Sequence, residues 1–183
     1  NLNSRDIDIT SYLENADINI INQFLVDQFT SGIATGELKV RGSIDSPDVV
    51  ADLNCKNIIY RDFTLDNLSL HSEMKSDSSF PSGFVNLKMD NGKWNNEKFD
   101  NGTLDISFSK ERMVVENFHF KSGDDYFILS GSWFSKNKYK IDKIQATYKE
   151  NYLINPKPIY IAYQDTSIII EPFEIHINDG ILD

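Results

Sequence analysis

The chain has 183 residues, and its 28 acidic and 18 basic side chains give it a net charge of -10 at pH 7. That charge repels phosphate backbones, so we expect no nucleic-acid partner. No stretch approaches the roughly 20 consecutive apolar residues that cross a bilayer. The single cysteine, Cys55, excludes an internal disulfide framework and a multi-cysteine metal site, and its apolar neighbours predict that it is buried.

The first predicted element is a short helix over about residues 18–29. Ile18, Ile21, Leu25 and Phe29 recur at helical spacing, and Ser31–Gly32 would end the helix. Because a short helix gains its stability from packing, we expect it to close one end of a β core. A helix that binds a membrane or a partner is the alternative.

From residue 36 onward, apolar and polar side chains alternate in segments of strand length. Leu38 and Val40 share one parity, whereas Glu37 and Lys39 share the other, which predicts strands with one dry and one wet face. Aromatic residues become more frequent in the later segments. Those later segments are residues 113–120, 126–134, 139–148, 158–163 and 166–177.

Two short motifs predict hairpin turns between strands. Asp90-Asn91-Gly92 and Asp100-Asn101-Gly102 supply residues that tolerate positive φ, as two-residue hairpin turns require.

Residues 113–120 are similar in sequence to residues 168–175, and Glu116 aligns with Glu171 in this internal repeat. Repetition of this kind is typical of stacked supersecondary units. We therefore expect one continuous segment over residues 1–183, with repeat-like units over about 36–110 and 111–183.

The run of residues 36–47, GELKVRGSIDSP, followed by an alternating strand, closely resembles the repeat of the TamB family of AsmA-like envelope proteins. The resemblance implies a translocation and assembly module in the Gram-negative periplasm. It also implies a parent chain anchored in the inner membrane, a part in phospholipid transport, and assembly of outer-membrane proteins with a barrel partner. Because the sequence begins without Met and stops within an alternating run, we expect a piece of a longer chain, whose other parts would meet that barrel.

The predicted fold is all-β: an elongated, curved antiparallel sheet that forms a U-shaped, taco-like groove with an apolar interior. Such a face must close on itself, meet a second sheet or hold apolar ligand, because burial is worth about 25 cal/mol per Å². We expect phospholipid acyl chains to lie along it, while a closed sandwich is the competing structure. The predicted lining residues are Leu38, Val40, Val49, Ala51, Leu53, Leu68, Leu70, Met74, Val85, Leu87, Met89, Leu104, Ile106, Phe108, Phe118, Phe120, Ile168, Ile170, Phe173 and Ile175.

No residue pattern predicts catalysis, a cofactor or a metal site. His71, His119 and His176 lie far apart and lack the spacing of zinc ligands, so we expect them at the surface. The sequence thus predicts a lipid-binding structural segment and not an enzyme. The alternative is an elongated β-repeat module with a dry core that binds protein or carbohydrate through its rims.

Overall fold

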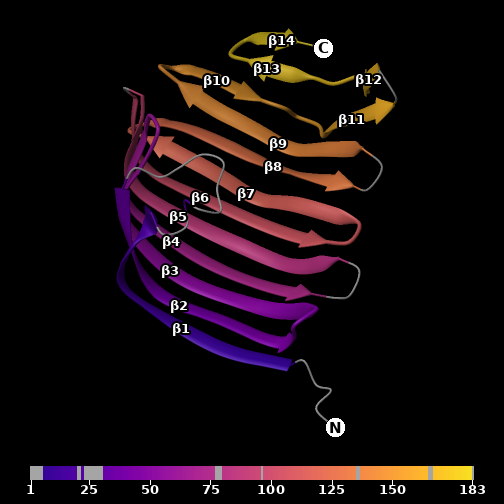
Figure 1. The fold of residues 1–183 in the computed structure, drawn as a ribbon. Helices are drawn as coiled ribbons and strands as arrows, with labels where there is room; N and C mark the ends of the chain where they lie inside the picture. The colour runs from indigo at the N-terminus through magenta and orange to yellow at the C-terminus, as the bar shows by residue number, and fades with distance from the viewer. Residues whose placement is uncertain are drawn as a thin grey trace.

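The computed structural model describes residues 6–19, 22, 31–76, 80–95, 97–134, 137–164 and 167–182, and they form one curved antiparallel sheet of 14 strands (Figure 1). Each strand from β1 to β9 pairs with the next one along the chain, and β10 pairs with β13. No pairing among the described residues joins β1 to the other edge, so the sheet stays open. The predicted all-β fold with a curved, groove-like sheet is confirmed. In this part of the chain no helix is long and apolar enough to span a bilayer.

The nine strands that build most of the sheet have 10 to 15 residues each. Their bounds are β1 Asp6–Asp17, β2 Ser31–Ser43, β3 Ser46–Tyr60, β4 Phe63–Ser76, β5 Pro81–Trp94, β6 Glu97–Ser109, β7 Arg112–Ser122, β8 Asp125–Phe134 and β9 Lys138–Tyr148. Five short strands follow them: β10 Asn151–Ile154, β11 Ile159–Gln164, β12 Ser167–Ile170, β13 Ile175–Ile177 and β14 Gly180–Leu182.

The sheet divides beyond β9. The first part of β9 pairs with β11, while its last part pairs with β10. Between these two partners the buried Asn155 replaces a strand: its Nδ2 donates to the carbonyls of Asp142 (3.3 Å) and Lys157 (2.9 Å), and its Oδ1 accepts from the Ile144 N–H. The side chain therefore satisfies backbone groups that the gap in the ladder would leave unpaired.

Pairing register keeps one set of side chains on one face across the sheet. Leu53 of β3 lies opposite Leu70 of β4, which lies opposite Leu87 of β5. Because side chains alternate between faces along a strand, their neighbours Asp52, His71 and Asn86 share the other face. We call the first set the apolar face and the second the polar face.

A line of local irregularities crosses β1 to β6 at one end of the strands. On β1, β3 and β5 it is marked by Asn15, Asn57 and Asn91, whose φ angles of 51°, 52° and 50° are left-handed. Asn tolerates this conformation better than other residues with a side chain. Successive residues of the apolar face are normally two positions apart along a strand. At each left-handed residue this spacing becomes three, as it does between Cys55 and Ile58. Figure 1 shows the strands bending toward this end.

The two Asp-Asn-Gly motifs lie inside strands, so the prediction that they form hairpin turns is wrong. Asp90-Asn91-Gly92 belongs to β5, and Asp100-Asn101-Gly102 belongs to β6. At Asn91, with φ of 50°, the reason is that a left-handed Asn can twist a continuing strand as well as reverse it, whereas Asn101 keeps a negative φ. The turn between β5 and β6 instead includes Asn95, with φ of 53°.

The glycines of these motifs make room for aromatic rings. A Cβ on Gly92 would lie 2.1 Å from Cζ of Phe99, and one on Gly102 would lie 3.2 Å from Cδ2 of Phe120. The two rings pack against each other, tilted by 40° and with centroids 4.4 Å apart. Small residues on the apolar face thus allow large ones on neighbouring strands to fold across it.

Most of the helix predicted over 18–29 lies outside the described residues. Of that span the structure describes Ile18, Asn19 and Asn22, which lie in tight turns after β1 and contain no α-helix. Asn19 N–H is capped by the Asp17 carboxylate at 2.9 Å. Ile18 is buried in one cluster with residues of β2 and β3.

The last predicted strand, over residues 166–177, is interrupted. β12 and β13 are separated by residues 171–174, which contain Pro172 and Phe173. Proline lacks the N–H that a ladder needs and restricts its own φ, so it ends the pairing here. In the internal repeat, Glu116 and Asn117 accompany a bulge of β7, whereas Glu171 and Pro172 accompany a full break.

Replacing Gly92 with Val should destabilise the fold by about 1–3 kcal/mol, because the new side chain collides with the Phe99 ring and the Thr64 carbonyl. The measurement is the urea unfolding midpoint. Gly123→Asn is the matched control, since Gly123 has φ of 60°, which Asn accepts, and nothing within 4 Å of its Cβ position. Equal midpoints for the two variants would contradict the packing described for Gly92.

Candidate functional site: the apolar face of the sheet

The apolar face is built from parallel rows of side chains, one row for each level of the strands. The row through Leu53 is almost entirely Leu, Phe and Ile from β1 to β9. Its members are Leu13, Gly36, Leu53, Leu70, Leu87, Leu104, Phe118, Leu129 and Ile144. Eight steps of about 4.8 Å make this row about 38 Å long.

The register brings nearly all predicted lining residues together on this face. They fall on the row of Leu53 or on the three rows beside it, and Ile168 and Ile170 join through their pairing with β11. Ile175 shares the face of Ile177, which lies opposite Leu153 of β10. Phe173 lies between β12 and β13, outside the ladder. That these residues contact lipid remains a prediction.

At the end that carries the left-handed residues, the apolar face is closed by its own side chains. Ile58, Leu65 and Phe99 are each 3% exposed and belong to one cluster with Ile18 and Cys55. Phe63 stacks on Phe99 with centroids 5.8 Å apart. We call this cluster the dry core of the molecule.

At the opposite end, over β7 to β12, the same face is accessible. Met113 is 37% exposed and Trp133 is 43% exposed. Trp133 stacks on Tyr139 with centroids 6.3 Å apart, and Tyr139 meets Tyr163 edge-on at 5.4 Å. Large apolar side chains are therefore presented here without a covering layer among the described residues, and we call this region the open end.

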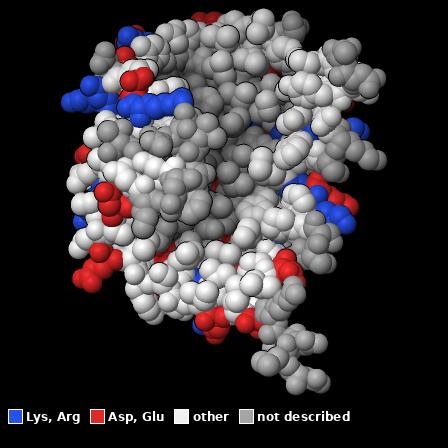
Figure 2. Space-filling model, in the orientation of Figure 1, with Lys and Arg blue, Asp and Glu red and all other residues white. Residues whose placement is uncertain are grey.

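Two hollows mark the open end. One of about 310 Å³ is lined by Met113, Val115, Leu129 and Ile141 among others, and Trp133 joins it to a second of about 380 Å³. The second hollow reaches the β6–β7 turn. In the face shown in Figure 2, charged side chains gather along the margins.

A comparison with models of protein families matches residues 13–112, more than half of the chain, to the model described as "TamB, N-terminal domain". The chain belongs to the TamB family. It is thus a segment of a Gram-negative envelope protein from a family of structural and transport modules. A search of curated proteins and a search of solved structures each returned no match.

Several residues of the open end of this TamB-family chain were missed by alternation alone. The bulge of β7 between Val115 and Phe118 shifts the apolar face from odd to even positions within one strand. A second shift separates Ile141 from Ile144 on β9. A prediction that assigns one parity to a whole segment therefore identifies the apolar face on only one side of each bulge. The aromatic enrichment of the later segments was the signal that pointed to this region.

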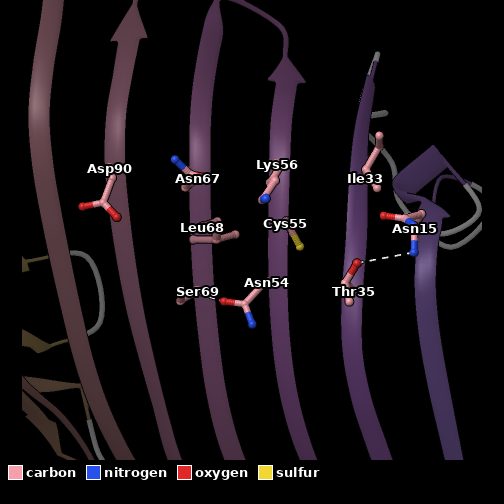
Figure 3. A pocket seen from close by; sticks show the side chains of 10 residues that line it. All are labelled: Asn15, Ile33, Thr35, Asn54, Cys55, Lys56, Asn67, Leu68, Ser69 and Asp90. Carbon is pink, nitrogen blue, oxygen red and sulfur yellow. Dashed lines mark hydrogen bonds between the residues drawn. The ribbon is translucent and has the colours of Figure 1, made fainter.

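The polar face carries a hollow of about 460 Å³ across β1 to β5 (Figure 3). Its polar groups bond to one another: Asn15 N–H donates to Thr35 Oγ1 at 3.3 Å, and Ser69 Oγ donates to Asn54 Oδ1 at 2.9 Å. No group of three His, Cys, Asp or Glu side chains placed to hold a metal occurs in the described residues. This hollow accompanies the irregular line of the strands and shows no arrangement for chemistry.

The predicted surface histidines lie on the polar side of their strands or near the chain's last hairpin. His71 Nδ1 lies 2.5 Å from the Asp52 carboxylate, across β3 and β4. His176 bonds to Glu174, and the His176 interaction lowers the pKa of the Glu174 carboxyl. Each histidine with such a partner makes a local polar contact on a half-exposed surface.

Truncation of Phe99 and of Trp133 should affect stability differently, because the two residues lie at opposite ends of the apolar face. Phe99→Ala removes the centre of the dry core and should cost about 3–5 kcal/mol of stability. Trp133→Ala removes a half-exposed ring and should cost less than about 1 kcal/mol. Urea denaturation measures both, and similar losses for the two variants would show that the open end is packed as tightly as the core.

Cys55 provides a prediction on pH. Burial raises the pKa of its thiol, because the thiolate loses its hydration. The folded chain therefore holds this proton more tightly than the unfolded chain, whose thiol titrates near about pH 8.5. The resulting stability is complete below that pH and is lost as pH rises through the raised value. Urea midpoints should consequently fall more steeply above about pH 8.5 in the natural chain than in Cys55→Ala, and parallel curves would contradict this.

Proposed function

We propose that this chain forms a lipid-binding groove segment of a periplasm-spanning TamB-family protein and supports phospholipid transport along its apolar face. The observation that carries the proposal is the absence of a covering layer over that face at its open end, within the described part of the chain. Exposed apolar surface on this scale is costly in water, and an acyl chain would relieve that cost.

The dimensions of the apolar face fit hydrocarbon. One leaflet of a bilayer holds about 15 Å of acyl chain, half of the roughly 30 Å hydrocarbon core. The row through Leu53 extends for about 38 Å, so a chain can lie along it and move from strand to strand. Among described residues of that row and of the adjacent row through Ala51, only Ser11 and Ser72 have polar side chains. Binding by shape and apolar contact gives a ligand no fixed position, which suits transport.

The closed sandwich, on which the alternative function of an adhesive module rested, has no second sheet in the described residues. Assembly of outer-membrane proteins with a barrel partner, and an inner-membrane anchor, remain predictions about the parent protein. No residue described here carries them.

The test compares two neighbouring positions that face opposite ways. Leu87→Asp puts a carboxylate in the middle of the apolar face, whereas Lys88→Asp puts the same group on the polar face. We expect the 183-residue chain to co-purify with phospholipid and to bind a fluorescent fatty acid. Leu87→Asp should weaken that binding by about tenfold or more, since a carboxylate cannot be desolvated against hydrocarbon without a large cost.

Circular dichroism serves as the control for folding in both variants. Lys88→Asp should bind the fatty acid as the natural chain does. Equal binding by the two folded variants, or no phospholipid and no fatty-acid binding by the natural chain, would refute the proposed function.

A further inference from the structure

The rim of the sheet beside the open end carries several cations, although the chain as a whole is acidic. The β6–β7 turn carries Lys110, β7 begins with Arg112, and the start of β9 carries Lys138 and Lys140. The same ends of β1 and β3 carry Asp6, Asp8 and Asp48, and Arg41 of β2 is paired there with Asp8 at 2.9 Å. Figure 2 shows Lys and Arg side chains, together with acidic ones, on the margin where the β6–β7 and β8–β9 turns lie in Figure 1.

Lys110 and Arg112 are placed directly beside an apolar hollow. Both line the hollow of about 380 Å³, together with Phe108, Met113 and Trp133. Through Met113 and Trp133 this space continues into the second hollow of about 310 Å³ on the apolar face. A molecule that fits both must be charged at one end and apolar at the other.

Arg112 is the first residue of β7, at the rim of the sheet, where it lies opposite Phe134 and its side chain follows the parity of the polar face rather than that of Met113. Its guanidinium carbon lies 5.2 Å from the centroid of the Phe134 ring, a cation–π contact that orients the planar group. Within the described residues neither Arg112 nor Lys110 forms an ion pair with a carboxylate, whereas Lys140 is paired with Asp142 at 2.5 Å. The edge of a guanidinium offers N–H groups in the geometry that binds two phosphate oxygens at once.

We propose that the open end is a headgroup-selective port for anionic phospholipids, in which Lys110 and Arg112 bind the phosphate while one acyl chain enters the hollow between Met113, Trp133 and Ile141. This inference rests on the proposed function and adds to it the charge of the preferred lipid. Glu111 lies in the same turn and repels a second negative charge, so a headgroup with a single net negative charge fits better than a more highly charged one.

The experiment incubates the 183-residue chain with vesicles of equal parts phosphatidylglycerol and phosphatidylethanolamine and then identifies the bound lipid by native mass spectrometry. The lipid bound to the chain should be enriched in phosphatidylglycerol over phosphatidylethanolamine by about threefold to tenfold, since two exposed cations each contribute modestly. Raising the salt from low to high concentration should reduce the enrichment, because exposed charges are screened.

The double variant Lys110→Gln with Arg112→Gln should lose the enrichment while the total amount of bound lipid stays within about twofold. The matched control is Lys88→Gln with Lys143→Gln, which removes the same charge from exposed positions on the polar face. It should keep the preference of the natural chain.

The outcomes separate the two proposals. Lipid binding without headgroup preference, or equal loss of preference in both double variants, would overturn the port and leave the lipid-binding groove standing. Absence of bound lipid in the natural chain would overturn both.

Discussion

The structure depends on one constraint, the register of antiparallel pairing that keeps every apolar row on the same face from β1 to β9. A slip of one residue between any two strands would send all apolar side chains of the later strands to the wet face. Few side chains are fully buried, and the dry core occupies only one end of the sheet. Backbone pairing and contacts along the rows, rather than a packed interior between two layers, therefore hold most of the molecule together.

The same sheet meets two opposite demands by treating its two ends differently. At one end, left-handed Asn residues bend the strands, and Gly92 and Gly102 let Phe99 and Phe120 fold across the face. That end is dry and supplies stability. At the other end the rings of Trp133 and Tyr139 line an accessible surface, and cations border it. A transport groove needs a dry core as well as an accessible surface, because a face that is apolar and open throughout would have no core to fix its shape.

Most of the fold could be predicted because alternation on one strand reports the face of each side chain directly, as it does for Leu38 and Val40. The curved all-β sheet and the family resemblance followed from such segments, whereas alternation is the same in an open groove and in a closed sandwich. Two features could not be read this way. The Asp-Asn-Gly motifs at Asp90 and Asp100 have the same local chemistry whether they reverse a chain or twist it, and only the pairing on both sides decides between them. Bulges on β7 and β9 exchange parity within a strand, which concealed Met113 and Ile141.

The two tryptophans allow the central claim, that acyl chains occupy the open end, to be measured directly. Trp133 lies in the open end, whereas Trp94 is an exposed residue beside the β5–β6 turn, beyond the dry core. Single-tryptophan variants, Trp94→Phe and Trp133→Phe, would be mixed with phospholipids carrying brominated acyl chains, which quench tryptophan fluorescence on contact. The account predicts strong quenching of Trp133 and weak quenching of Trp94. Weak quenching of Trp133 in a folded, lipid-saturated chain would contradict it.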